Sequence, residues 1–227
     1  MNKYKEIEHI LLDLDDTLYS YDIPHESALD CMLNLFETLV SIEKVKIREI
    51  YNTSRKIINE RLVGQAASHS RLLYAKEMCE SVGIRPILFA QELERAYWDH
   101  FLTKMVLNVG VMEFLDSCKK QKIGICIITD LTTEIQIRKI KKLGIEKYID
   151  YLVTSEEAGV EKPNRKIFDL AIFKLSANPK RTIMIGDNYN KDIIGAQEVG
   201  IRALHFSNKN FGAESVSSFF ELREKIN

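Results

Sequence analysis

A short apolar segment that ends in acidic residues constrains this chain more than any other feature of its sequence. His9–Leu12 is followed by Asp13, Asp15 and Asp16, with one leucine between the first two acids. Such a run, bounded by polar turn residues, is typical of a buried β-strand. Ligands of an open parallel sheet bind beyond the carboxyl ends of its strands, which predicts Asp13 at the mouth of a crevice and Asp15 just beyond it. The alternative is that Asp15, Asp16 and Thr17 only cap the next segment.

Composition and charge narrow the class of protein. A chain of 227 residues with 45% hydrophobic and 29% charged residues is typical of a soluble globular protein with one core and an insertion. The net charge of −1 and the lack of clustered Lys or Arg disfavour a nucleic-acid partner. The N-terminus leads straight into the first strand and no apolar stretch approaches spanning length, so we expect a cytoplasmic protein with no membrane partner. The oligomeric state, monomer or dimer, stays open.

The segment 21–107 has a different pattern from its flanks. Apolar residues recur there at helical spacing in Leu29–Val40, Ile47–Leu62, Ser70–Val82 and a stretch that opens at Pro86. We interpret their aromatic and Met stripes as the core of a helical bundle. The sequence therefore predicts an all-helical domain at 21–107, inserted into a second domain made of 1–20 and 108–227.

After position 108 the pattern alternates between helix and strand. Predicted helices cover Val111–Lys120, Thr133–Leu143, Asn164–Leu175 and Lys191–Val199, and predicted strands cover Ile123–Ile128, Tyr151–Val153, Thr182–Ile185 and Arg202–Phe206. This alternation favours right-handed crossovers between parallel strands. We predict an α/β fold with a Rossmann-like parallel sheet and helices on both of its faces.

Three of the predicted strands end in polar residues, namely Asp13, Thr129 and Asp187. The carboxyl ends of parallel strands lie at one edge of a sheet, so these side chains can meet. Lys162, at a helix entrance, and Asp192, in the first turn after Asp187, are expected to point toward the same edge. Taken singly, Thr129 could be a strand-end cap, Lys162 a solvated charge and Asp192 an acid that balances a helix dipole. Their joint occurrence favours a functional site.

Carboxylates that converge on one point favour a bound cation. Without one they repel each other and their pKa values rise. Oxygen ligands with no nearby His or Cys suit Mg²⁺, which takes few carboxylates and keeps waters for an anionic substrate. The sequence therefore predicts Mg²⁺ as the cofactor.

The same residues match a known set of motifs. The chain resembles the haloacid dehalogenase-like hydrolase superfamily through four motifs that occur in order across nearly its whole length: Asp13-x-Asp15-x-Thr17, Thr129, Lys162-Pro163 and Gly186-Asp187 followed by Asp192. The helical insert after the first motif resembles the cap that some members carry there. Gly186-Asp187-Asn188 is similar to the small nucleotide and sugar-phosphate phosphatases of this superfamily.

The resemblance implies a Mg²⁺-dependent phosphatase that hydrolyses a small phosphorylated metabolite, of the nucleotide or sugar phosphate class, through an aspartyl-phosphate. Asp13 would be the nucleophile and Asp15 the general acid and base. Lys162 and the Thr129 hydroxyl would bind the phosphoryl oxygens. These phosphatases most often have Asn where this chain has Asp130, which would put an extra negative charge near the bound leaving group.

The resemblance also implies the metal ligands. Mg²⁺ would be held by Asp13, the backbone carbonyl of Asp15, and Asp187, with Asp192 bound to it directly or through another ligand.

Two other functions stay open. A phosphomutase would use the same residues but pass the phosphoryl group to a second hydroxyl, with the cap excluding water from the phosphoenzyme. A phospho-receiver-like signalling module also gathers acids, a Thr and a Lys at strand ends, but it has no cap. The Asp15 acid disfavours a dehalogenase, which has no leaving alkoxide to protonate.

Arg71 is the candidate substrate-binding residue of the insert. It opens a predicted helix just after the segment 64–67, and from there it could reach a sugar hydroxyl or a second anionic group of a substrate. The alternative is that Arg71 is one more solvated charge on a helix.

Overall fold

The computed structural model describes residues 4, 6–208 and 214–226, and the chain divides into two compact units. One unit holds the described residues of Met1–Ser20 and Val106–Asn227. The other unit is Tyr21–Met105.

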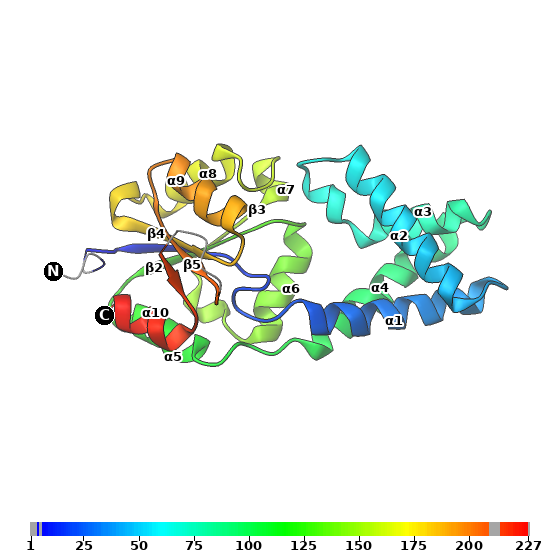
Figure 1. Ribbon diagram of the computed structural model, residues 1–227, viewed down its shortest axis with the longest axis horizontal. Helices are drawn as coiled ribbons and strands as arrows, with labels where there is room; N and C mark the ends of the chain where they lie inside the picture. The colour runs from blue at the N-terminus through cyan, green and yellow to red at the C-terminus, as the bar shows by residue number, and fades with distance from the viewer. Residues whose placement is uncertain (1–3, 5, 209–213, 227) are drawn as a thin grey trace. The chain divides into compact units, whose positions relative to one another are not determined.

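A parallel sheet forms the centre of the first unit. In the described part of the chain it has six strands in the order β3-β2-β1-β4-β5-β6 (Figure 1). The strands are β1 (His9–Leu12), β2 (Gly124–Thr129), β3 (Tyr151–Thr154), β4 (Thr182–Gly186), β5 (Arg202–Phe206) and β6 (Ser215–Val216). β1 lies between β2 and β4, and Leu11 is in register with Cys126 and Met184. The strand order reverses beside β1, which is where an open α/β sheet binds its ligands.

Helices cover both faces of this sheet. They are α5 (Val111–Lys120), α6 (Thr133–Leu143), α7 (Ser155–Ala158), α8 (Arg165–Leu175), α9 (Gly195–Glu198) and α10 (Phe219–Ile226). α8 and α9 lie on one side, and α5 and α10 lie on the other (Figure 1). Leu11, Ile128, Met184 and Phe168 are fully buried in the core between the sheet and α8. A sheet covered on both faces needs apolar strands, and the predicted α/β fold with a Rossmann-like parallel sheet is confirmed.

Some segments of this unit differ from the predicted elements. The chain after β4 forms a π-helical turn, η4 (Tyr189–Ile194), and only then α9, where the sequence predicted one helix from Lys191. Local π-helical turns are frequent at functional sites because they redirect one side chain, here Asp192. β6 and α10 were not predicted either. A two-residue strand such as β6 has too few residues to establish a periodicity.

The second unit consists of helices in its described residues. They are α1 (Asp22–Leu39), α2 (Lys44–Arg61), the 3₁₀ turn η1 (Ala66–His69), α3 (Arg71–Ser81) and α4 (Pro86–Lys104). α4 packs against both α1 and α3. Aromatic rings form much of the interior. At most 1% of the surface is exposed in each of Phe36, Tyr51, Tyr97 and Phe101. None of the described helices combines the length and the apolar character needed to cross a bilayer.

Candidate active site

The carboxyl end of β1 holds Asp13 in a fixed and almost buried position. Its backbone N–H donates to the Ile185 carbonyl at 2.9 Å, which extends the pairing of β1 with β4 by one residue. The Thr17 hydroxyl donates to Oδ2 of Asp13 at 3.0 Å and accepts from the Asp187 backbone N–H at 3.1 Å. Thr17 therefore ties the ends of two neighbouring strands together.

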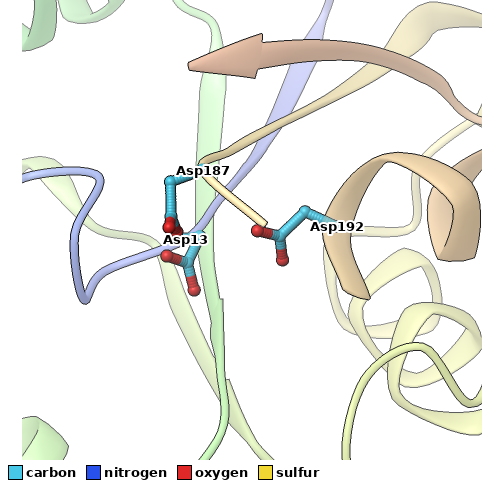
Figure 2. Close-up of side chains that lie close together, drawn as sticks. All are labelled: Asp13, Asp187 and Asp192. Atoms are coloured by element: carbon cyan, nitrogen blue, oxygen red, sulfur yellow. The ribbon is translucent and has the colours of Figure 1, made fainter. Parts of the chain in front are cut away.

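Three carboxylates gather at this edge of the sheet. Asp13, Asp187 and Asp192 each offer an oxygen atom, and the three atoms lie within 4.8 Å of one another. Figure 2 shows the carboxyl groups of Asp13 and Asp187 side by side and that of Asp192 turned toward them. Asp192 is fully buried, and a Cβ atom at Gly186 would overlap its carboxyl group. Glycine at position 186 is thus required for this close approach.

Lys162 brings one positive charge into the acidic cluster. Its Nζ lies 2.6 Å from Oδ1 of Asp13 and 2.6 Å from Oδ1 of Asp192, and it also donates to the Ile128 carbonyl at 3.2 Å. Burial opposes the charge on Lys162, but the two carboxylates hold its pKa well above the ordinary value. A buried ammonium paired in this way stays charged.

One ammonium does not balance three carboxylates. Burial raises the pKa of Asp13 well above its usual range; Lys162 lowers it, and Asp192 and Asp187 raise it further. Burial and the neighbouring charge of Asp192 raise the pKa of Asp187 to about 7. Burial and the repulsion between the carboxylates thus both disfavour the ionised forms, and a bound cation would offset both. Three carboxylates without a nitrogen or sulfur donor fit Mg²⁺ in the chemistry of their ligand atoms.

Asp15 points away from this cluster. Lys139 Nζ donates to its two carboxylate oxygens at 2.8 and 2.9 Å, the Tyr19 hydroxyl donates to Oδ1, and Gln136 Nε2 lies 3.4 Å from Oδ2. Burial disfavours the ionised form of Asp15, but the Lys139 charge outweighs it and the pKa of Asp15 falls below its ordinary value. That the backbone carbonyl of Asp15 binds a metal stays a prediction.

Thr129 and Asp130 lie at the end of β2. The buried Thr129 hydroxyl accepts from Gln136 Nε2 at 2.7 Å and donates to the Asp130 carbonyl at 3.2 Å. The Asp130 carboxylate accepts from the Lys162 backbone N–H at 3.0 Å and from Lys191 Nζ at 2.7 Å. The additional negative charge of Asp130 is therefore paired with a lysine, and its side chain anchors the loop that carries Lys162.

Arg71 lies in the helical unit, at the first residue of α3, where only 8% of it is exposed. Its guanidinium donates to the His69 carbonyl at 2.7 Å, to the Tyr97 hydroxyl at 3.3 Å and to the Tyr21 hydroxyl. Arg71 Cζ is 5.1 Å from the ring centroids of both Tyr97 and Trp98, within the range of cation–π attraction. The alternative of a solvated helix charge is wrong for this residue.

The hydrogen-bond and ring partners of Arg71 are neutral groups. Among the described residues it forms no ion pair with a carboxylate, and its Nε has no hydrogen-bond partner. The buried Tyr51 hydroxyl has none either. The helical unit thus holds a buried cation without a counter-charge of its own.

The sequence interpretation missed three residues that contact Asp15, namely Tyr19, Gln136 and Lys139. α6 has the sequence TEIQIRKIKKL, most of whose apolar residues lie on one face of the helix. Lys139 lies on that face, four residues from Ile135 and four from Leu143, whereas Lys141 lies on the opposite, charged face. Helical spacing therefore signals the burial of Lys139, but it does not identify Asp15 as its partner.

Comparisons with known proteins identify the family of this chain. The family model described as Haloacid dehalogenase-like hydrolase matches residues 10–206. A ribulose-1,5-bisphosphate 5-phosphatase of Halopiger xanaduensis is 35% identical over 199 residues, 87% of this chain and 83% of that protein. A glyceraldehyde 3-phosphate phosphatase of Methanothermobacter thermautotrophicus is 28% identical over 203 residues, with coverage of 87% and 84%.

Solved structures share the fold. A HAD phosphatase from Thermococcus onnurineus superposes with a TM-score of 0.73 at 19% identity and covers 96% of this chain and 97% of its own. A 2-haloacid dehalogenase from Pseudomonas syringae has a TM-score of 0.75 at 20% identity, with coverage of 97% and 98%. At these identities the likeness establishes the architecture, whereas the sequence relatives are phosphatases. The chain belongs to the haloacid dehalogenase-like hydrolase family and, with its curated relatives, to the phosphatases of that family.

Proposed function

We propose that this protein is a Mg²⁺-dependent phosphatase that hydrolyses a small phosphomonoester through an aspartyl-phosphate on Asp13. The observation that carries the proposal is the setting of Asp13, whose Oδ1 lies 2.6 Å from the buried Lys162 ammonium and whose carboxyl group belongs to a cluster with Asp187 and Asp192. A carboxylate next to a cation and a metal site can approach a phosphate dianion without prohibitive repulsion.

The names of the relatives support a sugar phosphate as the substrate. They are a ribulose-1,5-bisphosphate 5-phosphatase and glyceraldehyde 3-phosphate phosphatases. A shorter match to a pyrimidine 5'-nucleotidase, over 40% of this chain, supports nucleotides as a second class of candidate substrates.

In the first half-reaction an Asp13 oxygen forms a bond to phosphorus as the bond from phosphorus to the leaving oxygen breaks. Asp15 donates a proton to the leaving oxygen, which departs as a neutral alcohol. The pairing with Lys139 favours the carboxylate form of Asp15 before substrate binds. The negative charge of an arriving phosphate opposes that preference and favours protonation of Asp15.

In the second half-reaction Asp15 is the base. Its carboxylate takes a proton from the water that attacks phosphorus, the bond from phosphorus to Asp13 breaks, and inorganic phosphate leaves. Lys162 and Thr129 donate hydrogen bonds to the phosphoryl oxygens in both steps and stabilise their charge.

Mg²⁺ fits the acidic cluster and completes the proposed site. Asp13, Asp187 and Asp192 would hold the ion, together with the backbone carbonyl of Asp15. When bound, Mg²⁺ supplies positive charge that offsets the charges of the nucleophile and the phosphate. The raised pKa values of Asp13 and Asp187 support this assignment, because a bound cation would offset both the cost of burying these carboxylates and the repulsion between neighbouring carboxylates.

We propose that residues 1–20 and 108–227 form the catalytic domain and that 21–107 form a cap that recognises the leaving group. The insertion point supports this division, because the chain leaves the sheet unit at Ser20, shortly after Asp15. Arg71 is our candidate for recognition, since a buried cation with no carboxylate partner suits a second anionic group or a hydroxyl of the substrate.

A phosphate-release assay with Mg²⁺ tests the proposal. The substrates are ribulose 1,5-bisphosphate, glyceraldehyde 3-phosphate and pyrimidine nucleoside 5'-monophosphates, with Asp13→Asn as the control enzyme. We expect the wild-type protein to release phosphate from at least one of them and Asp13→Asn to release none. Phosphate release by the variant would contradict the mechanism. Conversion of a sugar phosphate into an isomer without free phosphate would identify a phosphomutase instead.

A further inference from the structure

α6 carries two polar side chains that are completely buried. Gln136 and Lys139 both have an exposure of 0%, and they lie one helical turn apart on the same face. Other lysines of this helix, such as Lys141 and Lys142, are exposed. A buried ammonium is costly unless charged and polar partners compensate it, so its contacts indicate why it is there.

Lys139 forms an ion pair with Asp15. The Nζ of Lys139 lies 2.8 and 2.9 Å from the two carboxylate oxygens, so it bridges the whole carboxyl group. The Tyr19 hydroxyl also donates to Oδ1. With donors on both oxygens, the carboxyl group of Asp15 has one preferred orientation.

Gln136 connects Asp15 to the end of β2. Its Nε2 donates to Oγ1 of Thr129 and to the Asp130 carbonyl, both at 2.7 Å, and lies 3.4 Å from Oδ2 of Asp15. These contacts place the side chains of Asp15 and Thr129 relative to each other. The positions of the Asp15 and Thr129 side chains therefore both depend on residues of one face of α6.

We propose that Lys139 and Gln136 are positioning residues, which hold Asp15 in the orientation that exchanges protons with the leaving oxygen and with water. This inference rests on the proposed function, in which Asp15 is the general acid and base. Lys139 acts only through Asp15, whereas Gln136 acts through both Asp15 and Thr129. Neither is required to touch the substrate.

A series of phosphate esters with increasingly basic leaving groups tests this role. kcat/KM is measured with Mg²⁺ for aryl phosphates with good leaving groups, which depart without a proton, and for alkyl phosphates, which need one. We expect Asp15→Asn to lose on the order of 10²-fold in kcat/KM for the alkyl phosphates and little for the best aryl phosphate. Lys139→Met should lose roughly tenfold in the same leaving-group-dependent manner, because a misplaced acid is a weaker catalyst. Lys142→Met, on the exposed face of α6, is the matched control.

The double variant Asp15→Asn/Lys139→Met separates positioning from a structural role. If Lys139 acts only through Asp15, the double variant is no slower than Asp15→Asn alone, whereas independent effects would multiply. A loss in Lys139→Met that is equal for all esters, a gain in its activity, or multiplied losses in the double variant would overturn the inference. If Lys139→Met does not fold, Lys139→Arg takes its place with the same criteria. No leaving-group dependence in Asp15→Asn itself would instead refute the proposed role of Asp15.

Discussion

The ammonium group of Lys162 lies 2.6 Å from Oδ1 of Asp13, although 149 positions separate the two residues in the chain. Both side chains are nearly buried, with exposures of 4% and 7%. Removing one partner of a buried ion pair leaves an uncompensated charge and typically costs about 3–5 kcal/mol. A change of charge at these strand ends therefore changes the electrostatic energy of the Asp13 carboxylate, the proposed nucleophile.

Asp13→Asn should abolish turnover and keep the fold. An amide does not attack phosphorus, but it has the shape of the carboxyl group and removes repulsion with Asp187 and Asp192. Phosphate release and thermal unfolding followed by circular dichroism measure the two effects. Glu8→Gln, which neutralises an exposed carboxylate beside β1, should leave turnover unchanged. Unchanged turnover in Asp13→Asn would refute the nucleophile assignment.

Mg²⁺ should raise the melting temperature of the wild-type protein, and a chelator should abolish its activity. A ligand that binds only the folded state stabilises it, by about 2.7 kcal/mol at one hundred times its Kd. Asp187→Asn should reduce this stabilisation more than Asp192→Asn does, because Asp192 is already paired with Lys162 at 2.6 Å. Asp169→Asn, in an exposed pair on α8, is the control. A full Mg²⁺ effect in Asp187→Asn would exclude that residue as a ligand.

Asp130→Asn should change activity little, whereas Asp130→Leu should impair it. Asparagine still accepts a hydrogen bond from the Lys162 backbone N–H and loses only the partly exposed pair with Lys191, which is worth about 0–1 kcal/mol. Leucine leaves that N–H without its acceptor, at a cost of about 1–3 kcal/mol, and allows Lys162 to move. Lys191→Met should match Asp130→Asn. Phosphate release and melting temperature of the three variants check this order, which a large effect of Asp130→Asn would contradict.

Arg71→Met should discriminate between substrates. Methionine fills much of the same space among the aromatic rings but carries no charge, so a substrate with a second anionic group should lose on the order of 10²-fold in kcat/KM. A simple aryl phosphate should be hydrolysed as before, since the phosphoryl-transfer residues are unchanged. Arg71→Lys, which keeps the charge, should recover part of the loss. Equal losses on both substrates would make Arg71 a structural residue of the helical unit.

His25 should make the stability of the protein depend on pH. Burial, together with the charge of Arg71, lowers its pKa to about 4 from an ordinary 6.5, with further effects from Glu26, Arg55 and Asp22. Its Nδ1 lies 2.6 Å from the Tyr97 hydroxyl. The unfolded chain binds a proton more readily than the folded one, so the contribution is complete above about pH 6.5 and is lost as the pH falls toward 4.

His25→Asn removes the titrating group, so the variant is the control for the wild-type protein. The free energy of unfolding of the wild-type protein, measured by urea denaturation at pH 7.5 and pH 5, should fall more than that of the variant. Equal falls in the two proteins would show that His25 is already neutral in both states or charged in both.

The order of the strands and helices before β6 could largely be read from the sequence, because it depends on local periodicity. An apolar run ending at Asp13, and others ending at Thr129 and Asp187, indicated where buried strands stop. Parallel pairing then required these ends to share one edge, and the structure brings the two acids into a single cluster with Asp192. The close approach of Asp192 to Gly186 was not foreseeable, since it depends on a π-helical turn.

The direction and partners of the side chains were decided by the tertiary structure. Lys139 pairs with Asp15 across 124 positions, and the Asp130 carboxylate accepts a hydrogen bond from the Lys162 backbone N–H. The guanidinium of Arg71 lies near aromatic rings from two other segments, the start of α1 and α4. Sequence spacing fixes the face on which a residue lies, but burial and pairing depend on which elements fold against that face. The amino-acid sequence by itself thus determined the sheet, the edge at which its acidic residues gather and the family. Only the tertiary packing decided which buried charges compensate one another, because these pairs join residues far apart in the chain.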